Sequence, residues 1–270
     1  MAVVLLSEKA ERLSSTLERM ESVVIAFSGG ADSALVAAVA ARVLGDRALA
    51  VTAVSPSLPP GELEAARETA KAAGVRHRTV RTSEIELESY RANGLDRCYH
   101  CKTELYDVLG ELAVREDYAV VASGANADDL GDFRPGLRAA SEHLVRHPLV
   151  EAGLGKDDVR ELSRELELPT WDKPASACLS SRFAFGVRIG VEELSKVGRA
   201  ERAIKELGFR QVRVRVHGDV ARVEVEQNDI ARIVEHRDAV TAALKTLGYR
   251  FVTIDLEGFR SGSMNPPDAG

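Results

Sequence analysis

The chain has 270 residues and a formal net charge of −6 at pH 7, with 45% hydrophobic and 29% charged residues. This length suits one large domain or two moderate ones with a sizeable core. The mild acidity argues against an extensive nucleic-acid surface, which usually has a basic footprint. No apolar run is long enough to span a bilayer, and no signal peptide is evident at the N-terminus. We therefore expect a cytoplasmic protein that acts on neither membranes nor nucleic acids.

Strands and helices are predicted to alternate from the N-terminus to about residue 170. Apolar, β-branched runs indicate the strands, and amphipathic or alanine-rich runs indicate the helices. Such alternation is typical of parallel βαβ units, so we expect an α/β domain whose ligand lies at the carboxyl ends of the strands. The expected strands are 23–27, 48–54, 76–81 and 118–123, and the expected helices are 9–20, 34–44, 62–73, 103–115 and 157–168.

The pattern changes after Gly190. A helix at 192–207 precedes two alternating strands, 211–217 and 220–226, whose Gly-Asp connection predicts a hairpin. A helix at 229–247 and a strand at 250–256 follow, which together predict a smaller α+β domain. The expected division is an α/β domain at 1–170, a cysteine-bearing linker at 171–190, the α+β domain at 191–260 and a flexible tail at 261–270.

The motif Ser28-Gly29-Gly30-Ala31-Asp32-Ser33 follows the first predicted strand and precedes an alanine-rich helix. Glycines at a strand-to-helix turn let backbone N–H groups approach a phosphate, and the helix N-terminus favours negative charge. There is no Walker lysine and no G-x-G-x-x-G pattern. The motif resembles the pyrophosphate loop of the ATP pyrophosphatases, which are adenine nucleotide alpha hydrolases. That resemblance implies hydroxyls from Ser28 and Ser33, amides from Gly29 and Gly30, and Asp32 as a support of the loop or of Mg²⁺. A simple turn capped by Asp32 and Ser33 is the alternative.

Three cysteines are present, Cys98, Cys101 and Cys178. The C-x-x-C pair lacks the further ligands that zinc needs, so a redox dithiol, two buried thiols or a cluster site formed with Cys178 remain open. Cys178 lies in an aperiodic run between Lys173 and Arg182. Nearby cations lower a thiol pKa and favour the nucleophilic thiolate, which makes Cys178 a candidate catalytic residue.

The predicted hairpin places Arg213 and Arg215 on one face of a strand, because side chains two apart point the same way. Arg222 and Glu224 share a face of the partner strand. A pair of arginines can clamp a phosphate. A solvated face with cross-strand Arg–Glu pairs is the alternative, and spacing alone favours it.

Across nearly its whole length the chain resembles the LarE sulfur transferases, members of the ATP pyrophosphatase group that help to build the nickel-pincer nucleotide cofactor. That family adenylates a carboxylate of pyridinium-3,5-biscarboxylic acid mononucleotide with MgATP and then inserts sulfur through a cysteine. The matching stretches are 28–33, 98–102, 124–136, 147–149, 171–182 and 255–265.

The resemblance implies roles for single residues. Cys178 would form a thioester with the substrate, and either its own sulfur is given up or sulfide comes from a 4Fe-4S cluster held by Cys98, Cys101 and Cys178. It also implies a sulfur donor and a homo-oligomer. The remaining implied site residues are Asp128 and Asp129 at the nucleotide, Arg213 and Arg215 at the substrate phosphate, and Arg182, Glu201, Glu224 and Asp229 around the substrate.

Three other functions share some of these features. A tRNA thiolase of the same superfamily would be expected to carry a basic patch or an RNA-binding module. An ammonia-dependent adenylating ligase would have no use for three cysteines. A non-catalytic cluster or nucleotide carrier would not release pyrophosphate from ATP.

Overall fold

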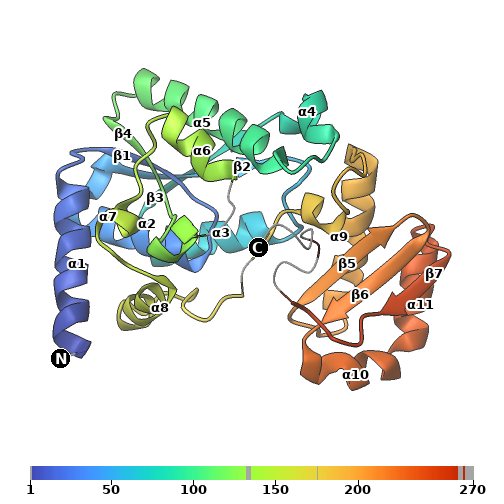
Figure 1. Ribbon diagram of the computed structural model, residues 1–270. Helices are drawn as coiled ribbons and strands as arrows, with labels where there is room; N and C mark the ends of the chain where they lie inside the picture. The colour runs from blue at the N-terminus through green and yellow to red at the C-terminus, as the bar shows by residue number, and fades with distance from the viewer. Residues whose placement is uncertain (1, 132–134, 175, 261–263, 265–270) are drawn as a thin grey trace. The chain divides into compact units, whose positions relative to one another are not determined.

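The computed structural model describes residues 2–131, 135–174, 176–260 and 264. No helix in these ranges is both long and apolar enough to cross a bilayer. The boundaries expected at 170 and 190 stay a prediction, and the tail expected at 261–270 lies outside the described residues apart from Met264. The chain divides into two compact units (Figure 1), the first comprising Met1–Ser55, Gly61–Glu84 and Asp96–Ser176 and the second Pro56–Pro60, Ile85–Leu95 and Ala177–Gly270.

The first unit is built around a parallel sheet of order β3-β2-β1-β4. The central strands β1 and β2 are apolar on both faces, as buried parallel strands require. β3 lies at an edge, where the exposed Arg76 and Arg78 discourage pairing with another chain. The strands are β1 (Val23–Ala26), β2 (Ala48–Val54), β3 (Arg76–Arg81) and β4 (Val120–Ser123).

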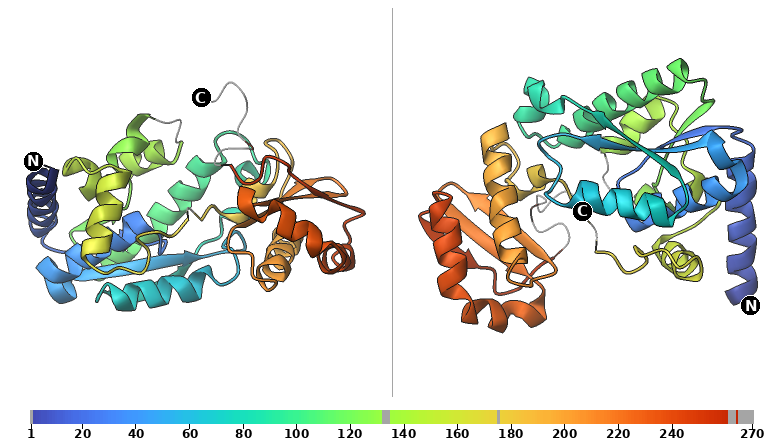
Figure 2. Two further views of the ribbon diagram at one scale, coloured as in Figure 1. Left: turned by 90° about the horizontal axis from the view of Figure 1, so that it is seen from below. Right: turned by 180° about the vertical axis from the view of Figure 1, so that it is seen from behind.

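Helices cover both faces of this sheet, as Figures 1 and 2 show. Ile25 packs in one cluster with Leu35 of α2, and its neighbour Val24 packs on the opposite face with Leu109 of α5. This arrangement confirms the expected α/β fold. The helices of the first unit are α1 (Ala2–Glu18), α2 (Ala31–Leu44), α3 (Glu62–Ala72), α5 (Arg97–Arg115), α6 (Pro135–Glu142), α7 (Pro148–Glu151) and α8 (Lys156–Glu165).

The second unit holds a mixed sheet of order β5-β6-β7. β5 (Val212–His217) and β6 (Val220–Val225) form the expected hairpin, and Gly218 supplies the positive φ of 59° that its turn needs. β7 (Phe251–Ile254) pairs with β6 in parallel. Valines of β5 and β6 pack against α9 and α11, which leaves the arginines on the other face. The helices are α4 (Glu88–Arg91), α9 (Val191–Lys205), α10 (Ile230–Glu235) and α11 (Arg237–Thr246).

Several helices differ from the sequence-based expectation. α1 begins at Ala2 instead of residue 9, and α4, α6 and α7 were not expected. α5 begins at Arg97 instead of residue 103, because the backbone carbonyl of Asp96 accepts hydrogen bonds from Tyr99 and His100 and starts the first turn early. The helix expected at 229–247 is broken at His236, whose Nδ1 contacts the carbonyl of Arg232 at 2.9 Å. Sequence patterns locate a helix by its apolar periodicity. Neither the polar start of α5 nor the break at His236 changes that periodicity, so the sequence did not predict them.

Candidate functional site

The loop between β1 and α2 brings two hydroxyl groups together. The Oγ atoms of Ser28 and Ser33 lie 3.2 Å apart, and Ser33 also donates to the carbonyl of Gly30 at 3.2 Å. The N–H of Gly30 donates to Ser28 Oγ at 3.3 Å. Hydroxyls, backbone amides and the N-terminus of α2 therefore meet at the carboxyl end of β1, an arrangement suited to an anion.

A residue with a side chain would be strained at position 29 for two reasons. The φ of Gly29 is +70°, and a Cβ atom there would lie 2.8 Å from the Cα of Ala66 on α3. The carbonyl of Gly29 accepts a hydrogen bond from Lys173 Nζ at 3.2 Å, and Lys173 also pairs with Glu62 at 3.0 Å. Within the first unit, Lys173 therefore holds the phosphate loop, residues 28–33. Its expected effect on the Cys178 thiol stays a prediction.

Acidic side chains gather beside this loop around Asn126. Asn126 Nδ2 donates to Asp32 at 2.8 Å, and its backbone N–H donates to Asp129 at 3.1 Å. Burial raises the pKa of Asp32, the hydrogen bond from Asn126 opposes that rise, and the charge of Asp129 adds to it. Asp128 is exposed and accepts from the backbone N–H of Lys156 at 2.7 Å. The structure thus brings the three expected aspartates of the first unit to one loop cluster.

Arg182 in the second unit is completely buried. It holds the loop that carries Cys178, which we call the cysteine loop. Its Nη1 donates to the carbonyls of Ala177 and Cys178, both at 2.9 Å. Its Nε and Nη2 donate to the two carboxylate oxygens of Glu201 at 2.7 and 3.0 Å. Arg182 therefore shapes the backbone at Cys178, whose side chain is half-buried.

The arginine face of the hairpin is buried, so the solvated part of the alternative is wrong, whereas the cross-strand pairing of Arg215 with Glu224 that it expected is present. Arg213, Arg215 and Glu224 are at most 5% exposed. Arg215 donates from Nε to Glu224 at 3.0 Å and from Nη1 to the carbonyl of Ser181 at 3.0 Å, which links this face to the cysteine loop. Arg213 lies over the ring of Phe259. Asp229 forms an ion pair with Arg232 of α10, and its expected place around the substrate stays a prediction.

Cys98 and Cys101 lie in the first two turns of α5, within the first unit, whereas Cys178 belongs to the second unit. Cys98 is exposed and Cys101 is half-buried, and all three thiols are free of disulfides. In the described ranges, no group of three or more His, Cys, Asp or Glu side chains is arranged to hold a metal ion. Ligation of a cluster by these cysteines stays a prediction.

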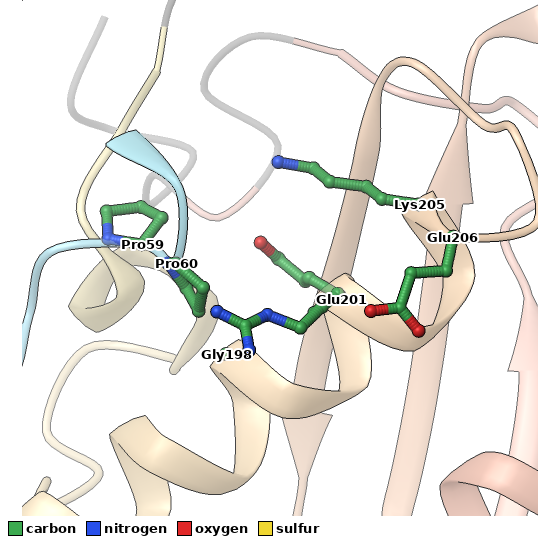
Figure 3. A pocket seen from close by; sticks show the side chains of 7 residues that line it. Pro59, Pro60, Gly198, Glu201, Lys205 and Glu206 are labelled. Atoms are coloured by element: carbon green, nitrogen blue, oxygen red, sulfur yellow. The ribbon is translucent and has the colours of Figure 1, made fainter. Parts of the chain in front are cut away.

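A pocket of about 230 Å³ lies in the second unit, beside α9 (Figure 3). Gly198 allows α9 to approach the loop before α3, because a Cβ there would lie 3.2 Å from the ring of Pro60. In Figure 3, the side chains of Glu201 and Lys205 point toward the side of the prolines. The pocket adjoins the Arg182–Glu201 pair and is lined by Pro59, Pro60, Gly198, Glu201, Arg202, Lys205 and Glu206.

Sequence reasoning missed several residues that support these sites. Asn126 joins two aspartates, and His147 contacts Ser123 Oγ at 2.8 Å where β4 ends. Tyr90 lies 2.6 Å from Ser180 in the cysteine loop. Their position in polar loops after predicted strands was the available signal, but it does not single out one side chain.

A parallel sheet whose first strand runs into Ser-Gly-Gly-x-Asp-Ser at the start of a helix defines an ATP pyrophosphatase (PP-loop) fold. Residues 11–173 match the family model of asparagine synthase. The chain is 38% identical over 261 residues to the pyridinium-3,5-bisthiocarboxylic acid mononucleotide synthase of Lactiplantibacillus plantarum, covering 96% of this chain and 95% of that protein. The chain therefore belongs to the asparagine synthase family of PP-loop proteins and, within it, to the family of this mononucleotide synthase.

Two further relatives are similar over most of their length. An uncharacterised protein of Synechocystis sp. is 46% identical over 263 residues, 97% of this chain and 98% of its own. An uncharacterised protein of Methanocaldococcus jannaschii is 30% identical over 241 residues, 89% of this chain and 92% of its own. Both alignments extend beyond residue 173, so the likeness includes the second unit.

Proposed function

We propose that this chain is an ATP-dependent sulfur transferase that converts a carboxylate of pyridinium-3,5-biscarboxylic acid mononucleotide into a thiocarboxylate, in nickel-pincer nucleotide biosynthesis. The observation that carries this proposal is the nearly full-length similarity to the bisthiocarboxylic acid mononucleotide synthase. The asparagine synthase match ends at Lys173, before Cys178. It therefore supports adenylation by the first unit, and the sulfur chemistry rests on the longer alignment.

Adenylation would take place at the phosphate loop. A carboxylate oxygen of the substrate attacks the α-phosphorus of ATP, the bond to the bridging oxygen breaks, and pyrophosphate leaves into the amides and hydroxyls of 28–33. Asp32 and Asp129 would hold Mg²⁺, which typically takes one or two carboxylates together with phosphate oxygens. The ion would neutralise charge on the departing pyrophosphate.

Sulfur transfer would use Cys178. Its thiolate attacks the carbonyl carbon of the acyl adenylate and expels AMP, which gives a thioester. In the single-use version, the Cβ–S bond then breaks as the Cα proton leaves, so the thiocarboxylate departs and dehydroalanine remains. In the other version, Cys98, Cys101 and Cys178 would hold a 4Fe-4S cluster that supplies an iron position open to hydrosulfide. Cys98 and Cys101 suit this role because one helical turn places them on the same face.

The buried arginine pair of the hairpin supports an anionic substrate in the second unit. Arg213 and Arg215 are at most 5% exposed and lie on one face of β5. Guanidinium groups bind phosphate oxygens in a forked geometry, which suits the phosphate of the substrate. We propose that Arg213 and Arg215 contact this phosphate with Glu224 orienting them. Arg182 and Glu201 position the cysteine loop, and Asp229 orders the start of α10.

The test uses protein purified without oxygen, MgATP, the biscarboxylic acid mononucleotide and hydrosulfide, with products followed by mass spectrometry. Wild type should release pyrophosphate and form thiocarboxylate. Cys178→Ser should still release pyrophosphate in a single turnover but form no thiocarboxylate. Thiocarboxylate formed by Cys178→Ser, or pyrophosphate release that does not depend on the substrate, would overturn the proposal.

Iron and acid-labile sulfide measured in the same preparation separate the two sulfur sources. Near-equal iron and sulfide that are lost in Cys98→Ala would support a cluster enzyme. Protein lighter by the mass of hydrogen sulfide after turnover, with no iron, would support the single-use cysteine.

A further inference from the structure

The cysteine loop of the second unit is held by two segments from earlier in the chain, 56–60 and 85–95. The N–H of Leu179 donates to the carbonyl of Ser57 at 2.8 Å. On its other side, the hydroxyl of Tyr90 lies 2.6 Å from the hydroxyl of Ser180, two residues after Cys178. Both segments are distant in sequence from Cys178, so they act on its loop through tertiary contacts.

The contact between Tyr90 and Ser180 is enclosed. Tyr90 is 1% exposed and Ser180 is fully buried. A buried hydroxyl that loses its partner cannot turn to water instead, so such a bond is expensive to break. Ser180 belongs to the short turn Leu179–Arg182, which begins directly after Cys178.

Asn93 provides a second anchor three residues later. Its backbone has a φ of +55°, a conformation that asparagine tolerates better than most residues. Its side-chain amide donates to the carbonyls of Ala184 and Val187 at 2.8 and 3.0 Å, and its own carbonyl accepts from Gly186 at 2.9 Å. Tyr90 and Asn93 thus hold the residues after Cys178 at two points, Tyr90 at Ser180 and Asn93 at Ala184 and Val187.

We propose that Tyr90 is a positioning residue for Cys178, acting through Ser180, with Asn93 holding the following turn. This inference rests on the proposed role of Cys178 as the nucleophile. Attack on an acyl carbon needs the sulfur within a few tenths of an ångström of its productive place, and a loosened turn loses that alignment. The adenylation step, which uses the first unit, does not depend on this contact.

The chain offers a matched control at Tyr249. This tyrosine also lies in the second unit and is 2% exposed, but its hydroxyl has no hydrogen-bond partner in the described part of the chain. Tyr90→Phe and Tyr249→Phe therefore remove the same atom from equally buried places. Only the first removes a hydrogen bond.

Hydrogen exchange and single-turnover kinetics on the full chain test the proposal. In Tyr90→Phe, amide exchange in 177–183 should accelerate about tenfold and thiocarboxylate formation should slow about tenfold, as expected for one lost hydrogen bond, while pyrophosphate release is unchanged. Tyr249→Phe should match wild type in all three measurements. Ser180→Ala should reproduce Tyr90→Phe, and the double variant should add little.

Unchanged exchange at 177–183 in both Tyr90→Phe and Ser180→Ala would overturn the proposal, as would an equal change in Tyr249→Phe. Equal slowing of pyrophosphate release and thiocarboxylate formation would also overturn it, because a general structural defect affects both. Hydrogen exchange needs no substrate. Failure of the proposed sulfur chemistry, seen as activity of Cys178→Ser, is therefore distinct from failure of this anchor.

Discussion

Arg182 and Glu201 form a doubly hydrogen-bonded ion pair inside the second unit, with side-chain exposures of 0% and 2%. Glu201 Oε1 also accepts the N–H of Val214 at 3.0 Å. The pair thus joins the loop of Cys178, the helix α9 and the strand β5. Charges buried this deeply are tolerated only because each neutralises the other.

Glu201→Gln should destabilise the protein strongly, because it leaves the Arg182 charge buried without its partner. The expected loss is about 3–5 kcal/mol, measured by urea unfolding. Glu88→Gln is the control, since Glu88 pairs with Arg188 at the surface, where the side chains are 68% and 52% exposed. That variant should unfold as wild type does. Equal losses in the two variants would contradict the role given to the buried pair.

Gly29→Ala should both destabilise the first unit and impair adenylation. The new Cβ would meet Ala66 in addition to the cost of a positive φ, so about 2–4 kcal/mol is expected. Gly74→Ala is matched, because its φ of +68° is nearly the same and no atom lies within 4 Å of the added Cβ. It should cost only about 1 kcal/mol and leave pyrophosphate release intact. The prediction fails if Gly74→Ala impairs pyrophosphate release as much.

Lys173→Met should weaken adenylation, because it removes the hydrogen bond from Nζ to the carbonyl of Gly29. A drop of about tenfold in substrate-dependent pyrophosphate release corresponds to one such bond. Lys9→Met removes a lysine of similar exposure that pairs with Asp158 at 2.6 Å, away from the loop. That variant should keep full activity, and a comparable loss there would show that the effect is not specific to the loop.

Stability should fall as the pH drops below about 6.5. Burial, and to a lesser degree the charge of Arg67, lowers the pKa of His77, and burial also lowers the pKa of His147. In the unfolded chain these rings take up a proton near pH 6.5, whereas the folded protein resists it. The unfolded state therefore binds more protons in that range, and a lower pH shifts the equilibrium toward unfolding.

Urea unfolding at pH 7.5 and 5.5 checks this expectation. His147→Gln should lose less stability between the two pH values than wild type does. His143→Gln should lose more stability than wild type does. Burial lowers the pKa of His143, but its contacts with the Ala139 carbonyl and with Asp107 outweigh burial and raise that pKa. The charged ring of His143 therefore stabilises the folded state in acid. Equal losses in the two variants would contradict both assignments.

Much of the fold could be predicted from sequence because its signals are local. The strands at β1, β2, β3 and β4 follow from apolar or alternating runs, and the hairpin follows from Gly218-Asp219. The early start of α5 could not be predicted, since Cys98 to Lys102 carries no apolar period. The break lies at His236, whose ring contacts the carbonyl of Arg232, and it leaves the helical pattern on both sides intact.

The same contrast applies to the candidate site. The sequence by itself determined the parallel sheet, the phosphate loop at its first strand and the separate cysteine loop, because periodicity and glycine placement act over a few residues. Only the tertiary structure decided that the hairpin arginines are buried and that Arg182 serves the backbone of Cys178. It alone revealed the contact between Tyr90 and Ser180, which are 90 residues apart. Local pattern cannot identify such partners, because burial and charge neutralisation depend on which distant segments the folded chain brings together.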